Sequence, residues 1–285
     1  DCNVDGSNNT VVGSQALNFN TSSNSTAVGY AAAYCSTNCQ NTAVGSLALR
    51  GSGTSNGIGN TAVGYRALCK NTSGGCNVAI GIDVLCSNTE GSWSAAVGYK
   101  ALCSNTTGYS NVAVGNLTLC SNTTGNNNIG AGYYALGSNT CGSCNVAIGY
   151  QANRCNTTGC NNVALGKCAL NKSGGVDHNI AIGCGSMLYN TTGSGNVAIG
   201  RQAYNGATSP YSNSGSCNVA IGYQPMLYNA GGGCNVAIGS QPLYSNVVGC
   251  HNTAMGWQSL YYSTSGSNNA SIGYRAMFCN TTGSY

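Results

Sequence analysis

The chain has 285 residues, with only 9 Lys or Arg and 5 Asp or Glu, and a formal net charge of +4. The cations form no basic run, which argues against a nucleic-acid-binding protein. No apolar stretch approaches the ~18 residues of a membrane span. Gly, Asn, Ser and Thr are abundant, but the apolar residues recur regularly, which argues against disorder.

A glycine recurs sixteen times, usually behind a small apolar tripeptide, and eleven of the fifteen intervals are seventeen residues long. A strict short period indicates one structural unit stacked on copies of itself. Seventeen residues are too few for two helices and suit short strands and turns. The sequence therefore predicts an all-β fold: a parallel β-solenoid or β-roll of about sixteen coils, forming a single domain over residues 1–285. These repeat glycines are Gly13, Gly29, Gly45, Gly64, Gly81, Gly98, Gly115, Gly132, Gly149, Gly166, Gly183, Gly200, Gly222, Gly239, Gly256 and Gly273.

Each predicted strand lies directly before a repeat glycine, and its side chains alternate in character. In one repeat, Val146 and Ile148 would point to one face, and Asn145, Ala147 and Gly149 to the other. We expect the Val and Ile, with the Leu or Met four residues after the glycine, to fill the coil, because burying them gives the larger hydrophobic gain. The Ala and Gly would then form a flat outer strip. The alternative places the Ala and Gly inside and the Val and Ile outside.

An Asn stands four residues before the repeat glycine in fourteen of the sixteen repeats. Stacked side-chain amides can hydrogen-bond along the solenoid at the strand spacing of ~4.8 Å. We therefore expect a structural asparagine ladder. Two insertions, near residues 50–59 and 207–215, interrupt the period and are expected to bulge as loops without interrupting the stack.

A second turn, of the type Asn-Thr-Thr-Gly, follows the Leu in many repeats. Asn and Gly tolerate positive φ, so this is ordinary turn chemistry. Each copy is also an N-glycosylation sequon. In a secreted eukaryotic protein the sugars would line one edge, which we favour; in a bacterial protein the same residues would only form turns. The sequons that share this turn begin at Asn20, Asn71, Asn105, Asn122, Asn156, Asn190 and Asn280.

Eighteen cysteines, an even number, indicate an oxidising compartment and disulfides rather than zinc. Some pairs flank one turn, and others lie one coil apart, within the Cα separation that a disulfide accepts. The pairs that flank a turn are Cys35–Cys39, Cys69–Cys76 and Cys155–Cys160; those one coil apart are Cys168–Cys184, Cys217–Cys234 and Cys86–Cys103, with Cys103–Cys120 competing; and Cys141–Cys144 is a local pair.

Aromatic residues directly follow half of the repeat glycines. Rows of Tyr on a solenoid can bind sugars or a partner subunit, and the alternative is that they pack over the turns. These interface candidates are Tyr30, Tyr65, Tyr99, Tyr133, Tyr150, Tyr223, Trp257 and Tyr274. The acids and histidines are too few and too scattered for a catalytic or metal site, so we expect no enzyme, no metal and no cofactor.

The string Asn-Val-Ala-Ile-Gly occurs at residues 145–149, 196–200, 218–222 and 235–239. It resembles the head repeats of trimeric autotransporter adhesins, and the similarity extends over nearly the whole chain. The resemblance implies a left-handed parallel β-roll, a trimer with small residues facing the neighbours, and a role in surface attachment.

Neither end of the chain carries a polar cap, so we expect exposed strand edges and association end to end. The leading hypothesis is a structural subunit of an extracellular filament or surface appendage, secreted, and assembling end to end or laterally through its repeated faces. One alternative is an adhesin or fibre shaft that binds surface glycans through its Tyr rows. Another is an ice-binding solenoid, although the usual Thr-x-Thr ladder is absent.

Overall fold

The computed structural model describes residues 6–18, 23–34, 39–51, 57–206 and 213–284, and every regular element in these ranges is a β-strand. The chain divides into two compact units, Asp1–Ser143 and Cys144–Tyr285. The first unit contains β1 (Thr10–Val12), β2 (Thr26–Val28), β3 (Thr42–Val44), β4 (Thr61–Val63), β5 (Val78–Ile80), β6 (Ala95–Val97), β7 (Val112–Val114) and β8 (Ile129–Ala131). The second contains β9 (Val146–Ile148), β10 (Val163–Leu165), β11 (Ile180–Ile182), β12 (Val197–Ile199), β13 (Val219–Tyr223), β14 (Val236–Ser240), β15 (Thr253–Met255) and β16 (Ala270–Ile272).

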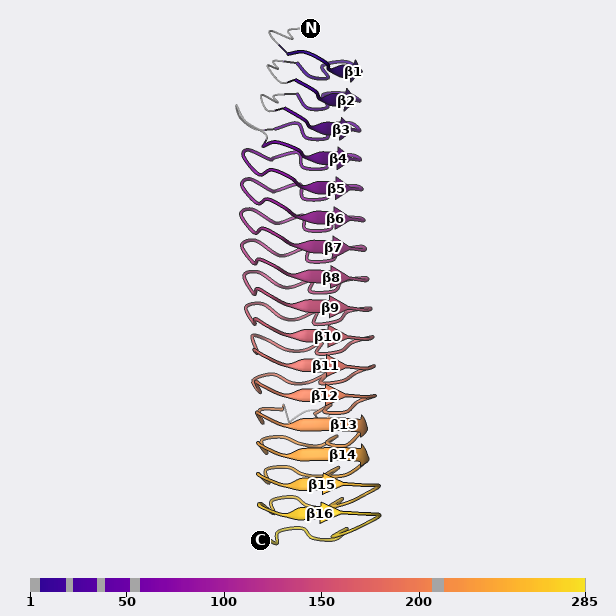
Figure 1. Cartoon of the computed structure of the whole chain (residues 1–285), viewed down its shortest axis with the longest axis vertical. Helices are drawn as coiled ribbons and strands as arrows, with labels where there is room; N and C mark the ends of the chain where they lie inside the picture. The colour runs from indigo at the N-terminus through magenta and orange to yellow at the C-terminus, as the bar shows by residue number, and fades with distance from the viewer. Residues whose placement is uncertain (1–5, 19–22, 35–38, 52–56, 207–212, 285) are drawn as a thin grey trace. The chain divides into compact units, whose positions relative to one another are not determined.

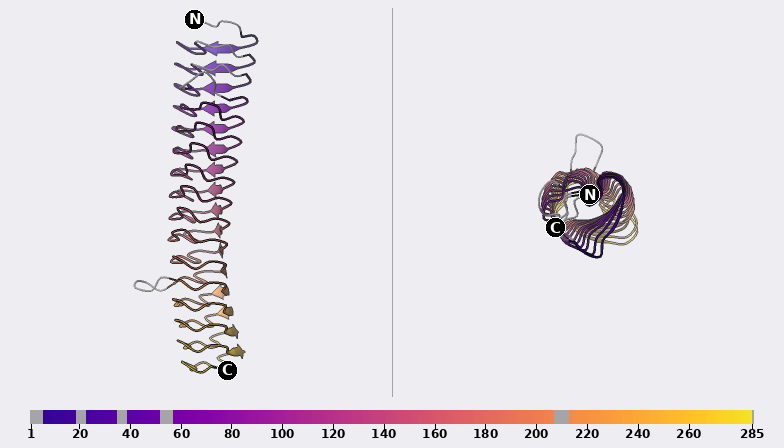
Figure 2. Two further views of the ribbon diagram at one scale, coloured as in Figure 1. Left: turned by 90° about the vertical axis from the view of Figure 1, so that its left-hand side faces the viewer. Right: turned by 90° about the horizontal axis from the view of Figure 1, so that it is seen from above.

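Within each unit, every strand pairs in parallel with the next one along the chain (Figure 1). Equivalent positions of consecutive repeats face one another, so that Ala79 lies opposite Ala62 on one side and Ala96 on the other. The turns of each unit stack in the same way as the strands (Figure 2). The predicted all-β parallel solenoid with a seventeen-residue spacing is therefore confirmed, while the single domain stays a prediction.

The repeat glycine follows the core of each strand because no other residue fits its backbone. Gly98 has φ of 135°, and a Cβ added there would lie 2.5 Å from the carbonyl oxygen of Gly115 in the next repeat. A side chain at this position would meet both a strained backbone and a steric overlap. The glycine therefore lets consecutive coils approach to strand spacing at the point where the chain turns.

The expected direction of the strand side chains is wrong, and the alternative is correct. The Ala in the middle of nearly every strand is fully buried; Ala79 and Ala198 are examples. The Val and Ile on either side of it are partly or largely exposed. The Leu four residues after the glycine is buried as expected, for example Leu102 and Leu170. The interior of each coil thus consists of Ala, Leu and Asn.

Strand alternation explains this reversal. Asn77 is buried, and its amide nitrogen donates to the carbonyl oxygen of Gly91, 2.8 Å away. Its side-chain oxygen accepts a bond from the backbone nitrogen of Ser94 over 2.9 Å. Since successive strand residues point to opposite faces, an inward Asn places Ala79 inward and the Val and Ile outward. Satisfying the turn carbonyls inside the coil outweighs the larger hydrophobic gain of burying Val or Ile.

The predicted asparagine ladder is confirmed in both units. In most repeats the backbone nitrogen of the Asn donates to the side-chain oxygen of the Asn one repeat earlier, as Asn77 does to Asn60 over 3.0 Å and Asn196 to Asn179 over 2.9 Å. Where the earlier repeat carries Ser, the hydroxyl accepts instead, as Ser94 does from Asn111 over 3.2 Å. Residues 52–56 and 207–212 of the two insertions lie outside the described ranges. On either side of them β3 pairs with β4 and β12 with β13, so the insertions leave the stack intact, as expected.

Candidate functional site

The most extensive surface feature is an apolar face on the strands of each unit. We define the strand face as the side chains one and three residues before each repeat glycine. They are Thr, Val, Ile, Ala, Leu or Met in every strand, and none carries a charge. Val114 is 46% exposed and Ile148 is 45% exposed. A continuous apolar face of this kind is unusual on an isolated soluble protein and is typical of an interaction surface.

The eight aromatic residues that follow a repeat glycine are also exposed. The first unit presents Tyr30, Tyr65, Tyr99 and Tyr133, and the second presents Tyr150, Tyr223, Trp257 and Tyr274. Trp257 and Tyr274 stand on consecutive repeats and their rings are in contact, with centroids 5.0 Å apart. Their exposure favours a contact surface over simple packing against the turns, which were the two interpretations left open by the sequence.

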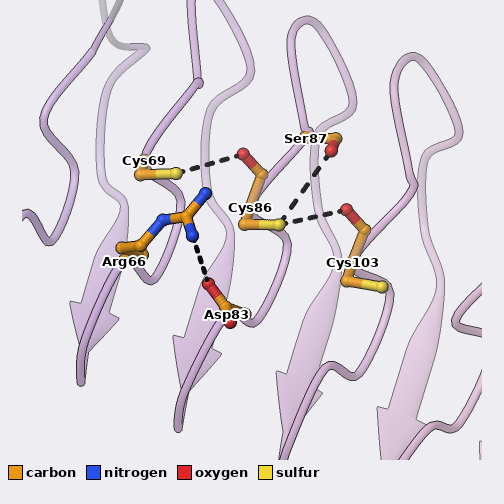
Figure 3. A network of polar contacts seen from close by, with 6 residues as sticks. All are labelled: Arg66, Cys69, Asp83, Cys86, Ser87 and Cys103. Carbon is orange, nitrogen blue, oxygen red and sulfur yellow. Dashed lines mark hydrogen bonds and ion pairs between the residues drawn. The ribbon is translucent and has the colours of Figure 1, made fainter.

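Four cysteines in the first unit, Cys69, Cys86, Cys103 and Cys120, occupy the same position of consecutive repeats and form a column of thiols. Figure 3 shows the first three of them. The sulfur of Cys69 donates to the carbonyl oxygen of Cys86 over 3.3 Å, and that of Cys86 to the carbonyl oxygen of Cys103 over 3.4 Å. The thiol of Cys103 donates to the carbonyl oxygen of Cys120 over 3.3 Å, and that of Cys120 to the carbonyl oxygen of Gly137 over 3.2 Å. Burial raises the pKa of the Cys69, Cys103 and Cys120 thiols. These cysteines therefore act as protonated hydrogen-bond donors.

Among the described cysteines, the structure forms no disulfide within either unit. Parallel neighbours in register have Cβ atoms about one strand spacing apart, ~4.8 Å, which is wider than the ~3.8 Å mean of a disulfide. Cys86 and Cys103 donate to carbonyl oxygens instead. The structure thus gives no support to the pairs Cys69–Cys76, Cys155–Cys160, Cys168–Cys184, Cys217–Cys234 and Cys86–Cys103. The Cys141–Cys144 pair spans the two units and stays a prediction, as does the pair of Cys39 with Cys35, which lies outside the described residues.

Five turn asparagines of the predicted sequons point into the coil. Asn71, Asn105, Asn122, Asn156 and Asn190 are all fully buried. The amide nitrogen that would carry a glycan donates instead to a turn carbonyl, as in the 2.8 Å bond from Asn71 to Gly74. These five asparagines therefore serve as structural turn residues in this structure, and their glycosylation stays a prediction. Asn280 is half-buried and stays a prediction, and Asn20 lies outside the described residues.

Two further side-chain columns run along the second unit. Glutamines two residues after the repeat glycine form a ladder, in which Gln224 donates to Gln202 over 2.7 Å and Gln241 to Gln224 over 3.4 Å. Five or six residues after the glycine, aromatic rings stack: Tyr244 and Tyr261 are 4.8 Å apart and nearly parallel, and Phe278 follows at 5.3 Å. The glutamine column was missed from the sequence, and counting positions from the repeat glycine would have found it.

A comparison of the chain with family models, with curated proteins and with solved structures found no match. Within the part of the chain that the structure describes, no group of three or more His, Cys, Asp or Glu side chains is placed to hold a metal ion. No helix in that part is long and apolar enough to cross a membrane. The exposed strand face and the exposed turn that follows it are therefore the candidate sites of function.

Proposed function

We propose that this chain is a structural protein that associates with further copies of itself through the strand face. The β-solenoid fold is compatible with a structural or fibre-like protein. The observation that carries the proposal is the uncharged apolar strand face, exposed in both units. Covering it would remove two columns of aliphatic side chains from water, at a gain of about 25 cal/mol for each Å² of apolar surface buried.

The regularity of the strand face favours a second copy as the occupant. Its side chains recur at the strand spacing of ~4.8 Å, because the strands are in register. Another copy presents the same spacing over the same length, so the ridges of one face match the grooves of the other along a whole unit. With no charge on either face, no ion needs to be desolvated on contact.

The setting we propose is an extracellular filament or surface appendage assembled laterally from such contacts. The similarity of the Asn-Val-Ala-Ile-Gly repeats to adhesin head repeats supports a surface role, and the abundance of cysteine in the sequence supports secretion. We include no enzymatic activity in this proposal, because repeated surfaces suit binding and assembly.

Sedimentation velocity over a range of concentrations tests the proposal. The purified chain should sediment as species larger than a monomer. Replacing Ile80 and Val114, both on the strand face, by lysine should shift the distribution toward the monomer, because two charges would be buried in each contact. A matched control places lysine at Ile82 and Asn116 instead. These two residues lie two positions further along the same repeats and are exposed in the turn. The control should sediment like the wild type.

The proposal would be refuted by a wild-type chain that stays monomeric at all concentrations. It would also be refuted if the Ile80→Lys/Val114→Lys variant and the Ile82→Lys/Asn116→Lys control associated equally well. Circular dichroism of both variants at low concentration verifies that each retains the β-sheet fold, so that the comparison concerns association alone.

A further inference from the structure

The cations of the chain, which look scattered in the sequence, share one position in the fold. We define the basic edge as the turn from one to six residues after each repeat glycine. All 9 Lys and Arg of the chain lie in these turns: Arg50, Arg66, Lys70, Lys100, Arg154, Lys167, Lys172, Arg201 and Arg275. Of the acids in the described residues, only Asp83 lies there, whereas Glu90 and Asp177 lie in other turns. The positive charge of each unit therefore lies along the basic edge.

In the first unit, three of these cations line one hollow. Arg50, Arg66 and Lys70, from two consecutive repeats, surround a space of about 290 Å³, together with Leu47 and Cys69. Among the described residues, no Asp or Glu lines it. Asp83 forms an ion pair with Arg66 over 3.4 Å (Figure 3). Arg50 and Lys70 are exposed, so their charges face any ligand that enters the hollow.

A second hollow, lined by aromatic rings, adjoins the first. It has a volume of about 190 Å³ and is lined by Tyr30, Tyr34 and Gln15, and it shares Arg50 and Leu47 with the cationic hollow. Exposed tyrosine rings beside cations suit a ligand that has both a flat apolar face and an acidic group. A sugar ring that carries a carboxylate or sulfate has both.

The same pattern of cations returns in the second unit. Arg50 and Lys70 stand five and six residues after consecutive repeat glycines, and Arg154 and Lys172 occupy the equivalent positions on the repeats of β9 and β10. Tyrosine again accompanies the cations, because Lys172 lies 4.7 Å from the ring of Tyr189. A cation pattern that recurs in each unit suits a ligand that is itself a repeating polymer.

We infer that the basic edge binds an acidic polysaccharide, with Lys and Arg contacting its acidic groups and Tyr packing against its sugar rings. The density of charge favours this polymer over a nucleic acid. The first unit holds four cations over eight strands spaced by ~4.8 Å, or about one per 10 Å. Duplex DNA carries one charge per ~1.7 Å. A polysaccharide with one acidic group on alternate sugars is much closer to the sparse spacing of the cations.

Fluorescence anisotropy with a labelled hyaluronan oligosaccharide, which carries one carboxylate on alternate sugars, tests this inference on the full chain at low and moderate salt. The wild type should bind the probe, with an affinity that falls as salt rises, and should not bind labelled neutral dextran. The Arg50→Gln/Lys70→Gln variant should bind about tenfold more weakly, as expected for the loss of two exposed charge contacts.

A charge-matched control separates the site from the overall charge. Thr107→Glu/Thr124→Glu also lowers the net charge by two, but both residues are exposed in the Asn-Thr-Thr-Gly turn, away from the basic edge. It should bind like the wild type. The inference is overturned if this control weakens binding as much as the Arg50→Gln/Lys70→Gln variant, if the wild type does not bind the hyaluronan probe at low salt, or if a single-stranded oligothymidine binds at least as tightly as that probe. Because none of these substitutions lies on the strand face, failure here leaves the proposed self-association untouched.

Discussion

The amide nitrogen of Asn105 donates a hydrogen bond to the side-chain oxygen of Asn88, seventeen residues earlier, over 2.8 Å. The same nitrogen donates to the carbonyl oxygen of Gly108 in its own turn, also over 2.8 Å. Asn122 in turn donates to the side-chain oxygen of Asn105 over 2.9 Å. One buried amide thus closes its own turn and joins three consecutive coils, which explains why the fold requires Asn where the sequence resembles a glycosylation signal.

Replacing Asn105 by Ala should lower the free energy of unfolding by about 3 kcal/mol, because it leaves buried partners in two neighbouring coils without a hydrogen bond. Thr107→Ala is the matched control, since it destroys the same sequon while Thr107 itself is exposed. The control should change stability by less than about 0.5 kcal/mol. Urea unfolding followed by circular dichroism measures both, and equal stability of the two variants would contradict a structural role for Asn105.

Replacing Gly98 by Ala should destabilise the chain by at least about 3 kcal/mol, because positive φ and the overlap with Gly115 act together. Gly174 provides the comparison: a Cβ there would meet nothing within 4 Å. Gly174→Ala should stay within about 1 kcal/mol of the wild type. If thermal unfolding gave the two variants the same midpoint, close packing of the repeat glycines would not be the reason for their recurrence.

The thiol column predicts a particular dependence on pH. Burial raises the pKa of Cys69, Cys103 and Cys120 in the folded chain. Their contribution to stability is therefore complete below the ordinary thiol pKa of about 8.5 and declines as pH rises through the raised values. The urea midpoint should consequently fall between pH 7 and pH 10.

A triple variant with Ser at these three cysteines should show a smaller fall, since a serine hydroxyl can donate the same bonds without ionising in this range. An identical alkaline fall in the triple variant would contradict the account. In the wild type at pH 8, iodoacetamide should modify the exposed Cys76 and Cys234 well before Cys69 and Cys120, as measured by peptide mass spectrometry.

The position of every strand could be predicted from the sequence, because the repeat glycine marks where each strand must turn. The direction of the side chains could not be predicted from hydrophobicity alone. A ranking of Val above Ala by transfer free energy ignores how small the interior of the coil is. Ala lies two residues after the ladder Asn, such as Asn60 or Asn77, and so lies on the same side of the strand; recognising that this Asn points inward would have placed Ala inside as well.

The candidate sites were predicted less completely. The exposed tyrosines follow directly from their position after the glycine. Disulfides and glycans were inferred from spacing and motif, and neither property reports whether Cys86 can approach Cys103 or whether Asn105 is buried. The basic edge was missed because the cations were sought as a run along the chain, although stacking brings residues one repeat apart into contact.

In nearly every strand Ala faces inward and Val or Ile faces outward, and one pair of variants in β12 tests this arrangement directly. Ala198 is fully buried and Ile199 is 37% exposed. Thermal unfolding at low protein concentration should show that Ala198→Lys loses at least about 4 kcal/mol or does not fold, because it buries an unpaired charge in a packed coil. Ile199→Lys should stay within about 1 kcal/mol of the wild type. A folded Ala198→Lys together with an unfolded Ile199→Lys would contradict the architecture and, with it, the proposed strand face.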